Sequence, residues 1–310
     1  MSSPPADVQI TAEIVRGLLA QAPRYAGLPA RFAAEGWDNE IWRLGADLAL
    51  RLPRRREGAG LIEKENRWLP LLASRISLPV PQPLFAGRPD DRYPYPWAVT
   101  RWLPGSPASG LPPVERDGYA DRLAKALREL HRAAPADAPV NPVRGGPLAE
   151  RAPYARERFA RLGTPAAPLG QALDDALEAP AYRGAPRWLH GDPHPFNTLV
   201  DGTRLSALID FGDLGAGDPA CDVGVGWLHF TPSGLRHFLD SYGAGPQLRR
   251  RARGCAAVYA SFMLLLEAEH PLHGCGERAL TTLRSDRARR GPHTGDARSS
   301  QNGYPRSERR

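Results

Sequence analysis

The spacing of hydrophobic residues changes about one third of the way along this 310-residue chain. Before residue 103, short alternating apolar runs are separated by turn residues, a pattern typical of strands. After residue 106, apolar residues recur at helical spacing, as in the stretch 120–133. Because the strands come before the helices instead of alternating with them, the sequence predicts an α+β architecture with two lobes. We expect a small N-terminal antiparallel-sheet lobe over residues 1–103 and a larger, mainly helical lobe over 104–285.

Individual elements follow from the apolar periods and from the Gly and Pro residues that interrupt them. In the first lobe we expect helices over 11–22 and 61–73, and strands over 32–35, 40–44, 48–52 and 97–103. In the second lobe we expect short strands at 188–190, 198–200 and 205–209. The helices expected there are 120–133, 150–162, 168–178, 221–229, 233–242 and 248–269.

Net charge argues against a nucleic-acid partner for the folded body. The chain has 41 Lys and Arg against 34 Asp and Glu, an excess that would suggest nucleic-acid binding if it were spread over one face. However, residues 107–283 hold 19 basic and 20 acidic side chains, and the excess is concentrated after residue 284. The stretch 286–310 is rich in Arg, Gly and Ser and has no apolar period, so we expect a disordered Arg-rich tail.

Segments that would direct the chain to a membrane are not evident in the sequence. The longest apolar run, Met263-Leu264-Leu265-Leu266, is far shorter than the about 20 residues that span a bilayer. The first residues lack the basic and apolar regions of a signal peptide. The three cysteines are too scattered for a disulfide framework or a zinc site. We expect a cytoplasmic protein with no membrane partner, either a monomer or a dimer.

The stretch 188–213 contains the residues that best account for a chemical activity. Asp192 lies in a polar loop between two short apolar strands, and Asn197 stands on the far side of the same loop. Asp210 ends the next apolar strand and is followed by Phe211-Gly212. Transfer of a γ-phosphoryl group needs a carboxylate near the acceptor hydroxyl and oxygen ligands for Mg²⁺. The order therefore predicts Asp192 as catalytic base and Asn197 and Asp210 as metal ligands.

Two motifs in this stretch resemble those of the aminoglycoside phosphotransferase and choline kinase-like family. They are His190-Gly191-Asp192-Pro-His-Pro-Phe-Asn197 and Ile209-Asp210-Phe211-Gly212-Asp213. The segment Gly217-Asp218-Pro219 and the loop Gly36-Trp37-Asp38-Asn39 are similar to further parts of the family and stand in the correct order. The resemblance covers most of the chain. It implies a protein-kinase-like fold, ATP or GTP as phosphoryl donor, Mg²⁺ as cofactor and a hydroxylated small molecule as acceptor.

One departure concerns the cation that holds the nucleotide phosphates. Kinase-like folds usually place a Lys on the third strand, but the lysines of this chain, Lys64 and Lys125, lie outside the expected strands. The matching position is Arg51, as in a macrolide-phosphotransferase-like subset of the family, with Glu65 as its helix partner. Arginine remains charged and can bind phosphate through two donors. Arg54, Arg55 and Arg56 are close alternatives in sequence.

The resemblance also implies where the rest of the nucleotide binds. Gly36, Trp37, Asp38 and Asn39 form the matching nucleotide loop, although this loop lacks the three glycines that usually surround phosphates. Trp102 and Leu103 match the connection between the lobes and are expected to line the base pocket. The choice between ATP and GTP remains open.

Several polar residues near the motifs are better explained by support of the loop than by chemistry. We expect His190 to hold the loop through a hydrogen bond to the backbone near Asp210, and not to shuttle protons. Asp218 and Asp222 are expected to anchor the catalytic loop or to cap a helix. Asp213 is a candidate for a second metal or substrate contact.

Three functions are compatible with the sequence. The first is a Mg²⁺-dependent O-phosphotransferase acting on an antibiotic such as an aminoglycoside or a macrolide, or on a related metabolite. The second is a nucleotide-binding pseudokinase without activity, which the unusual loop and the missing Lys favour. The third is nucleic-acid binding through the Arg-rich tail. A nearly neutral second lobe suits a neutral or weakly basic acceptor without excluding an aminoglycoside.

Overall fold

The small lobe is built on an antiparallel sheet. The computed structural model describes residues 4–290 of the chain, and in that part the strands of this sheet follow the order β1-β2-β3-β5-β4. β2 and β3 form a hairpin whose turn is made by Gly45 with φ of +59°, a value that glycine adopts without strain. The strands are β1 (Ala30–Glu35), β2 (Asn39–Leu44), β3 (Leu48–Pro53), β4 (Pro83–Gly87) and β5 (Trp97–Arg101).

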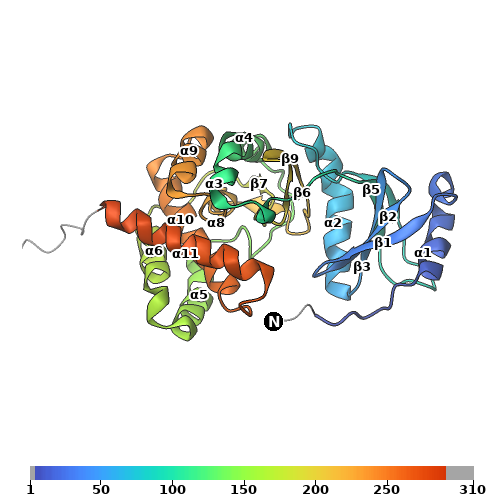
Figure 1. Ribbon diagram of the computed structural model, residues 1–310, viewed down its shortest axis with the longest axis horizontal. Helices are drawn as coiled ribbons and strands as arrows, with labels where there is room; N and C mark the ends of the chain where they lie inside the picture. Colours follow the sequence, from blue (N-terminus) through green and yellow to red (C-terminus); the bar gives the residue numbers. More distant parts are fainter. Residues whose placement is uncertain (1–3, 291–310) are drawn as a thin grey trace, which may run out of the picture.

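One face of this sheet is covered by α1 (Ala12–Leu18), where Thr11 caps the helix by accepting a hydrogen bond from the Ile14 amide. Val15 and Leu18 of α1 pack with Leu50 and Trp97 of the sheet in one apolar cluster. The helix α2 (Arg56–Ala73) lies on the opposite side of the sheet, between the sheet and the rest of the molecule (Figure 1). The first lobe therefore has the antiparallel sheet that the sequence predicted.

The helix α2 is shared between the two lobes. Its residues Trp68, Leu69 and Leu72 belong to the large apolar cluster of the second lobe and not to the cluster beneath the sheet. After α2 the chain remains attached to that lobe, because the Leu208 amide donates to the Pro79 carbonyl over 3.1 Å. The small lobe is thus joined to the large one by a packed helix as well as by the covalent connection near residue 103.

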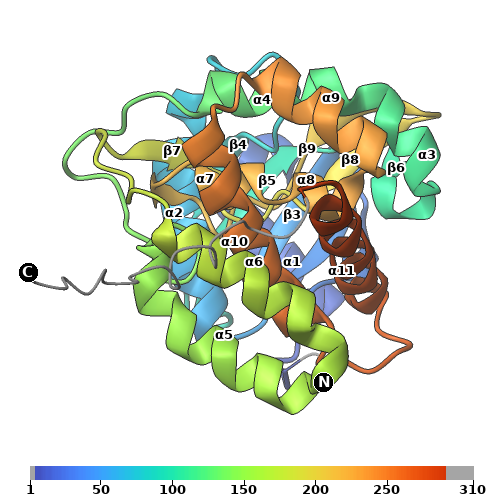
Figure 2. The same ribbon diagram turned by 90° about the vertical axis from the view of Figure 1, so that its left-hand side faces the viewer.

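The large lobe is mainly helical, with α10, α6 and α11 packed side by side (Figure 2). Short strands form two small sheets, with β10 beside β7 and with β8 between β6 and β9. These strands are β6 (Ser106–Pro107), β7 (Arg187–Leu189), β8 (Thr198–Asp201), β9 (Arg204–Leu208) and β10 (Gly215–Gly217). The helices are α3 (Pro113–Arg116), α4 (Ala120–Leu130), α5 (Leu148–Leu162), α6 (Ala167–Glu178), α7 (Ala220–Val223), α8 (Gly226–His229), α9 (Pro232–Tyr242), α10 (Pro246–Met263) and α11 (Pro271–Arg290).

The predicted start of the Arg-rich tail needs a correction. α11 was not expected from the sequence, and it runs through residues 286–290, which we had assigned to the tail. Its sequence contains Gly274 and Gly276, which weaken a helix in isolation, but Gly276 sits so close to α10 that a Cβ atom there would lie 3.0 Å from the Met263 Cβ. Close packing on α10 therefore accounts for a helix that local propensity does not predict. Residues 291–310 lie outside the described part.

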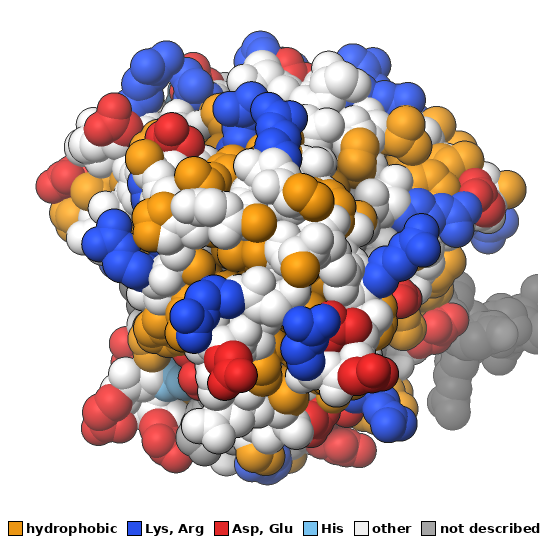
Figure 3. All heavy atoms as spheres, turned by 90° about the vertical axis from the view of Figure 1, so that its right-hand side faces the viewer, with side chains coloured by type: hydrophobic (Ala, Val, Ile, Leu, Met, Phe, Trp, Pro, Cys, Tyr) orange, Lys and Arg blue, Asp and Glu red, His pale blue; other side chains and the backbone are white. Residues whose placement is uncertain are grey.

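The surface does not show a continuous field of one charge on the face formed by the small lobe. Acidic and basic side chains are interspersed with apolar atoms there (Figure 3). Among residues 4–290, no helix combines the length and the apolar character that crossing a bilayer requires.

Candidate active site

The loop that follows β7 carries Asp192 and is fixed to the end of the neighbouring strand by His190. The imidazole of His190 is fully buried, packs 4.2 Å from the Phe211 ring and donates from Nε2 to the Ile209 carbonyl over 3.0 Å. Its Nδ1 accepts a hydrogen bond from the Asp192 amide. Burial lowers the pKa of His190, so the ring is neutral and suits this pair of bonds. His190 therefore ties Asp192 to the strand end that carries Asp210.

A second support of the loop comes from Asp222 in α7. Its carboxylate accepts hydrogen bonds from the backbone amides of His190 and Gly191 over 2.7 and 2.9 Å. Burial alone would raise the pKa of Asp222, but the hydrogen bond from His131 and the amide donors hold it below its ordinary value. Asp222 is thus a buried carboxylate that stabilises the loop.

Asp218 contributes one turn earlier and not to the loop itself. Its Oδ1 accepts from the Ala220 amide at the start of α7, and its Oδ2 pairs with Arg251 of α10 over 2.7 Å. The contacts of Asp218 therefore position the helix that carries Asp222. The loop support that we had expected from Asp218 is indirect.

The far side of the loop is held by two further side chains. His229 donates from Nε2 to the Pro193 carbonyl over 2.9 Å and accepts from the Tyr119 hydroxyl. The hydroxyl of Tyr259 donates to the Gly191 carbonyl over 3.1 Å. Sequence reasoning missed both, because neither lies near the motifs and each makes its contact only through the tertiary fold.

Asn197 and Asp210 are brought together by the backbone. The Ile209 amide donates to the Asn197 carbonyl over 2.9 Å, and Asn197 Nδ2 donates to the Asp192 carbonyl, which leaves its Oδ1 available to a cation. Asp210 is about half exposed and has φ of +60°, an uncommon value that Asp tolerates better than most residues. An amide oxygen and a carboxylate at one strand end suit Mg²⁺, which binds few protein ligands and retains water and phosphate oxygens.

The backbone at this turn takes its positive φ at Asp210 and not at the nearby Gly212. Gly212 matters for space, since a Cβ atom there would lie 3.3 Å from Asp210 Oδ1 and 3.4 Å from the Leu61 side chain. The absence of a side chain at position 212 lets the Asp210 carboxylate lie close to α2.

Arg51 and Glu65 form a buried ion pair between β3 and α2. Arg51 Nη2 lies 2.9 Å from Glu65 Oε1, and Nη1 contacts the other carboxylate oxygen. The same Nη2 is 3.6 Å from Asp210 Oδ1. Burial works to lower the pKa of Arg51, but the carboxylates of Glu65 and Asp210 more than offset it and raise the pKa. Arg51 therefore contacts two carboxylates, Glu65 of α2 and Asp210 of the large lobe, and these ion pairs link the two lobes.

The loop between β1 and β2 is shaped by Asp38. The Gly36 amide donates to the Asn39 carbonyl over 2.8 Å, and the Asp38 carboxylate pairs with Arg55 over 2.7 Å. Burial raises the pKa of Asp38 despite this pair. Trp37 and Asp38 are partly exposed, and Asn39 is buried with no hydrogen-bond partner for its Oδ1 in the described residues. Arg55 pairs with this loop and Arg54 pairs with Glu35 beside it over 2.8 Å, whereas Arg51 faces Asp210.

The connection between the lobes begins with Trp102. Its amide donates to the Asp47 carbonyl over 2.8 Å, and the Arg43 guanidinium lies 4.1 Å from its ring centroid. Trp102 and Leu103 are both partly exposed. Their role in binding a base stays a prediction.

Arg144 joins the site although no sequence motif indicated it. Its Nη2 lies 3.2 Å from Asp192 Oδ2, and its Nε lies 3.4 Å from Asp213 Oδ2. Burial works to lower the pKa of Arg144, but the charges of Asp192 and Asp213 outweigh burial and raise it. The residue lies in a Pro- and Gly-rich stretch without an apolar period, so only the tertiary fold reveals its contact with Asp192.

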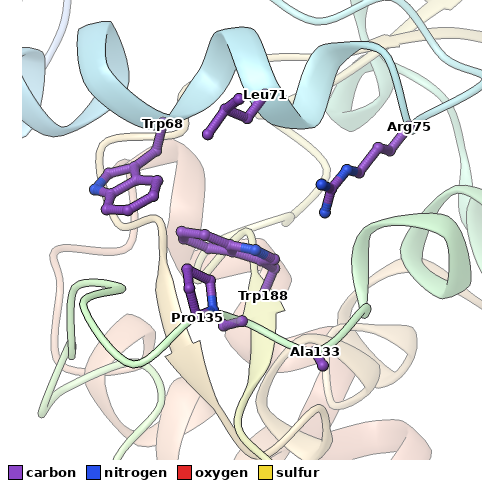
Figure 4. A pocket seen from close by; sticks show the side chains of 7 residues that line it. Trp68, Leu71, Arg75, Ala133, Pro135 and Trp188 are labelled. Atoms are coloured by element: carbon purple, nitrogen blue, oxygen red, sulfur yellow. The ribbon is translucent and has the colours of Figure 1, made fainter.

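A cavity of about 300 Å³ lies apart from these residues, between α2 and the strand β7. Arg75 extends from the end of α2 toward it, and Trp68 and Trp188 lie next to each other on its lining with ring centroids 5.1 Å apart (Figure 4). Its lining includes none of the predicted site residues. The cavity is therefore a feature of the packing between α2 and the second lobe.

The small antiparallel-sheet lobe and the mainly helical lobe, with the Asp192 loop, the Asp210 turn and the Arg51–Glu65 pair brought together, have the arrangement of a kinase-like phosphotransferase. The two-lobed α+β fold expected from the sequence is thus confirmed. Residues 29–257 match the family described as the phosphotransferase enzyme family, APH. The chain belongs to this family.

Solved structures of similar fold include two kinds of phosphotransferase. The GDP complex of wild-type aminoglycoside 2'-phosphotransferase-IIIa has a TM-score of 0.66 and 21% sequence identity, and the match covers 90% of this chain and 100% of that one. The apoenzyme of macrolide 2'-phosphotransferase MphH from Brachybacterium faecium has a TM-score of 0.58 and 24% identity, with 87% and 98% covered. Comparison with curated proteins gave no match.

Proposed function

We propose that this chain is a Mg²⁺-dependent O-phosphotransferase that moves the γ-phosphoryl group of ATP or GTP to a hydroxyl of a small molecule. The observation that carries the proposal is the way in which His190 joins the Asp192 loop to the strand end of Asp210. This arrangement gives an acceptor-side carboxylate and a metal-side carboxylate fixed positions relative to each other. Phosphoryl transfer depends mainly on such positioning and on electrostatic stabilisation.

Each side chain has a part in this reaction. Asp192 accepts the proton of the acceptor hydroxyl and orients that oxygen toward the phosphorus. Asn197 and Asp210 would hold Mg²⁺, which would supply positive charge to the nucleotide phosphates. Arg51, kept in place by Glu65, binds phosphate from the other side, and the loop from Gly36 to Asn39 covers the nucleotide. Trp102 and Leu103 line the base pocket.

The proposal also covers the extent of the two lobes, the location of the protein and its oligomeric state. Residues 1–103 form the nucleotide lobe and 104–285 the catalytic and acceptor lobe, and the protein works in the cytoplasm as a monomer or a dimer. One structure of similar fold is a complex with GDP and kanamycin, and another is a macrolide 2'-phosphotransferase. Both support an antibiotic or a related hydroxylated metabolite as the acceptor. Resistance to such an antibiotic would be the biological outcome.

A coupled nucleotide-consumption assay tests this function. The full chain is offered ATP or GTP with Mg²⁺ and panels of macrolides, aminoglycosides, amino alcohols and sugars. We expect turnover with at least one panel, a loss of about 10³-fold or more in Asp192→Asn, and in Asp210→Asn an additional loss of Mg·nucleotide affinity. Full activity in either variant contradicts the assigned roles.

The same assay separates the pseudokinase alternative. The loop without three glycines and the arginine in place of lysine are the observations that favour it. Stabilisation of the fold by Mg·ATP or Mg·GTP, together with no turnover on any panel, would support a nucleotide-binding protein without transferase activity.

A further inference from the structure

We propose that Arg144 is a catalytic residue whose guanidinium binds a terminal oxygen of the transferred phosphoryl group. The inference rests on the proposed function and adds to it a cation that comes from the loop before α5. The proposed roles of Asp210 and of the Arg51–Glu65 pair do not depend on Arg144.

The position of the guanidinium is set by two carboxylates. Nη2 lies 3.2 Å from Asp192 Oδ2 and Nε lies 3.4 Å from Asp213 Oδ2, so the fork spans the two acidic segments. An acceptor oxygen that hydrogen-bonds to Asp192 lies about 3 Å from that carboxylate. The phosphoryl group that this oxygen attacks is then within reach of the same guanidinium. Arg144 remains about one-fifth exposed, so it is open to the site.

The local charge balance calls for such a cation. Asp192, Asp210 and Asp213 are the acidic residues of the proposed site, and carboxylates that no cation offsets repel phosphate oxygens. Arg51 is paired with Glu65 on the nucleotide side. Arg144 offsets two of the carboxylates and presents several N–H donors in one plane, a form that suits phosphate. The ion pair between Arg144 and Asp192 should reduce the rate of phosphoryl transfer only a little, because a loose transition state needs only a weak base.

The fold holds Arg144 in advance. Asn141 Oδ1 accepts hydrogen bonds from the amides of Val143 and Arg144, both over 3.0 Å, and Asn141 Nδ2 donates to Asp213 Oδ1. The loop packs on β10 so closely that a Cβ atom at Gly217 would lie 2.3 Å from the Gly145 carbonyl oxygen. Donors fixed before the reaction stabilise developing charge without having to reorganise.

The aromatic ring of Tyr259 completes the setting. The Arg144 guanidinium carbon lies 5.0 Å from the centroid of this buried ring, and the Tyr259 hydroxyl donates to the Gly191 carbonyl next to Asp192. The cation is thus stacked on a ring that belongs to the support of the catalytic loop. A salt bridge that served only stability would predict equal effects on every nucleotide state, and this difference makes the proposal testable.

The test compares nucleotides with and without the terminal phosphate. Calorimetry on the full chain measures Kd for the Mg²⁺ complexes of ADP and of the β,γ-imido analogue of ATP, and for the guanosine counterparts. In Arg144→Gln we expect the triphosphate analogue to bind about tenfold more weakly or worse, with diphosphate binding within about twofold of wild type. Arg144→Lys keeps the charge but not the fork, so we expect an intermediate ratio. Arg156→Gln removes an exposed arginine that pairs with Asp174 and serves as the matched control.

The outcomes separate this proposal from the proposed function. A wild-type ratio of the two Kd values in any folded Arg144 variant overturns the role of Arg144 and leaves the phosphotransferase proposal standing. If the wild type binds none of the four complexes, the proposed function fails and the inference about Arg144 fails with it. Thermal unfolding of each variant establishes folding, and Arg144→Lys decides the question if Arg144→Gln does not fold.

Discussion

Single residues decide how tightly the two lobes are coupled at the site. Both partners of the Arg51–Glu65 pair are buried: Arg51 is 7% exposed and Glu65 is 2% exposed. A pair of this kind need not stabilise the fold more than apolar residues would, but removal of one charge leaves the other buried without compensation. The pair is therefore a sensitive position for both stability and nucleotide binding.

We expect Glu65→Gln to lower the free energy of unfolding by about 3 kcal/mol and to weaken binding of Mg·ATP or Mg·GTP, because Arg51 loses its partner and its fixed position. Urea unfolding and calorimetry measure the two effects. Glu63→Gln on the same helix changes an exposed residue and should leave both quantities near wild type. Equal stability of the two variants would show that loss of the Glu65 charge does not leave Arg51 as a destabilising buried charge.

At the scale of elements, the loop that carries Asp192 depends on α8 for its shape, because His229 of that helix donates to the Pro193 carbonyl. Burial lowers the pKa of His229 to about 3, while its ordinary value is near 6.5. Between these two values the unfolded chain binds a proton that the folded chain excludes. Stability therefore falls as the pH decreases through this window and is restored above it.

This one histidine should cost about 1.4 kcal/mol of unfolding free energy per pH unit below about pH 6.5. Urea unfolding at pH 7, 6 and 5 gives the slope for the wild type, and His229→Gln should give a shallower one. His237→Gln, which changes an exposed histidine of α9, is the control and should follow the wild type. Parallel slopes for all three proteins would rule out His229 as the titrating group.

Elements also show where sequence reasoning is sufficient and where it is not. The alternating runs of β2 and β3 and the Leu spacing of α4 have local causes, and the sequence predicted them. α2 was expected to begin at 61 but begins at Arg56, because its first turn is stabilised from a distance: the Arg56 amide donates to Asp7 over 2.7 Å.

The predicted site shows the same division. Asp192, Asn197 and Asp210 are close in sequence to their supporting strands, so their order was enough to predict that they would meet. Arg144, Tyr259 and His229 reach the loop only through the packing of distant segments. The strand β10 was also missed, because its residues Gly215–Gly217 have no side-chain pattern and pair with β7 by close backbone approach.

At the scale of the whole molecule, the sharing of α2 between the lobes predicts cooperative unfolding. Leu72 is buried in the cluster of the second lobe, whereas its neighbour Leu71 is 53% exposed. We expect Leu72→Ala to cost about 3 kcal/mol and Leu71→Ala to cost less than about 0.5 kcal/mol. Scanning calorimetry should show a single transition in the wild type and in both variants. Two resolved transitions would mean that the lobes unfold independently.

The packing of α2 against both lobes also matters for the construction of chimeras between enzymes of this family. The sequence places the natural crossover point at residues 103–106, where the two lobes are joined. A chimera made there would bring an α2 whose Trp68, Leu69 and Leu72 evolved against the interior of another parent. Compatibility between parents will therefore depend on the fit of one helix to a foreign core, and exchange of the sheet without α2 should preserve the host protein best.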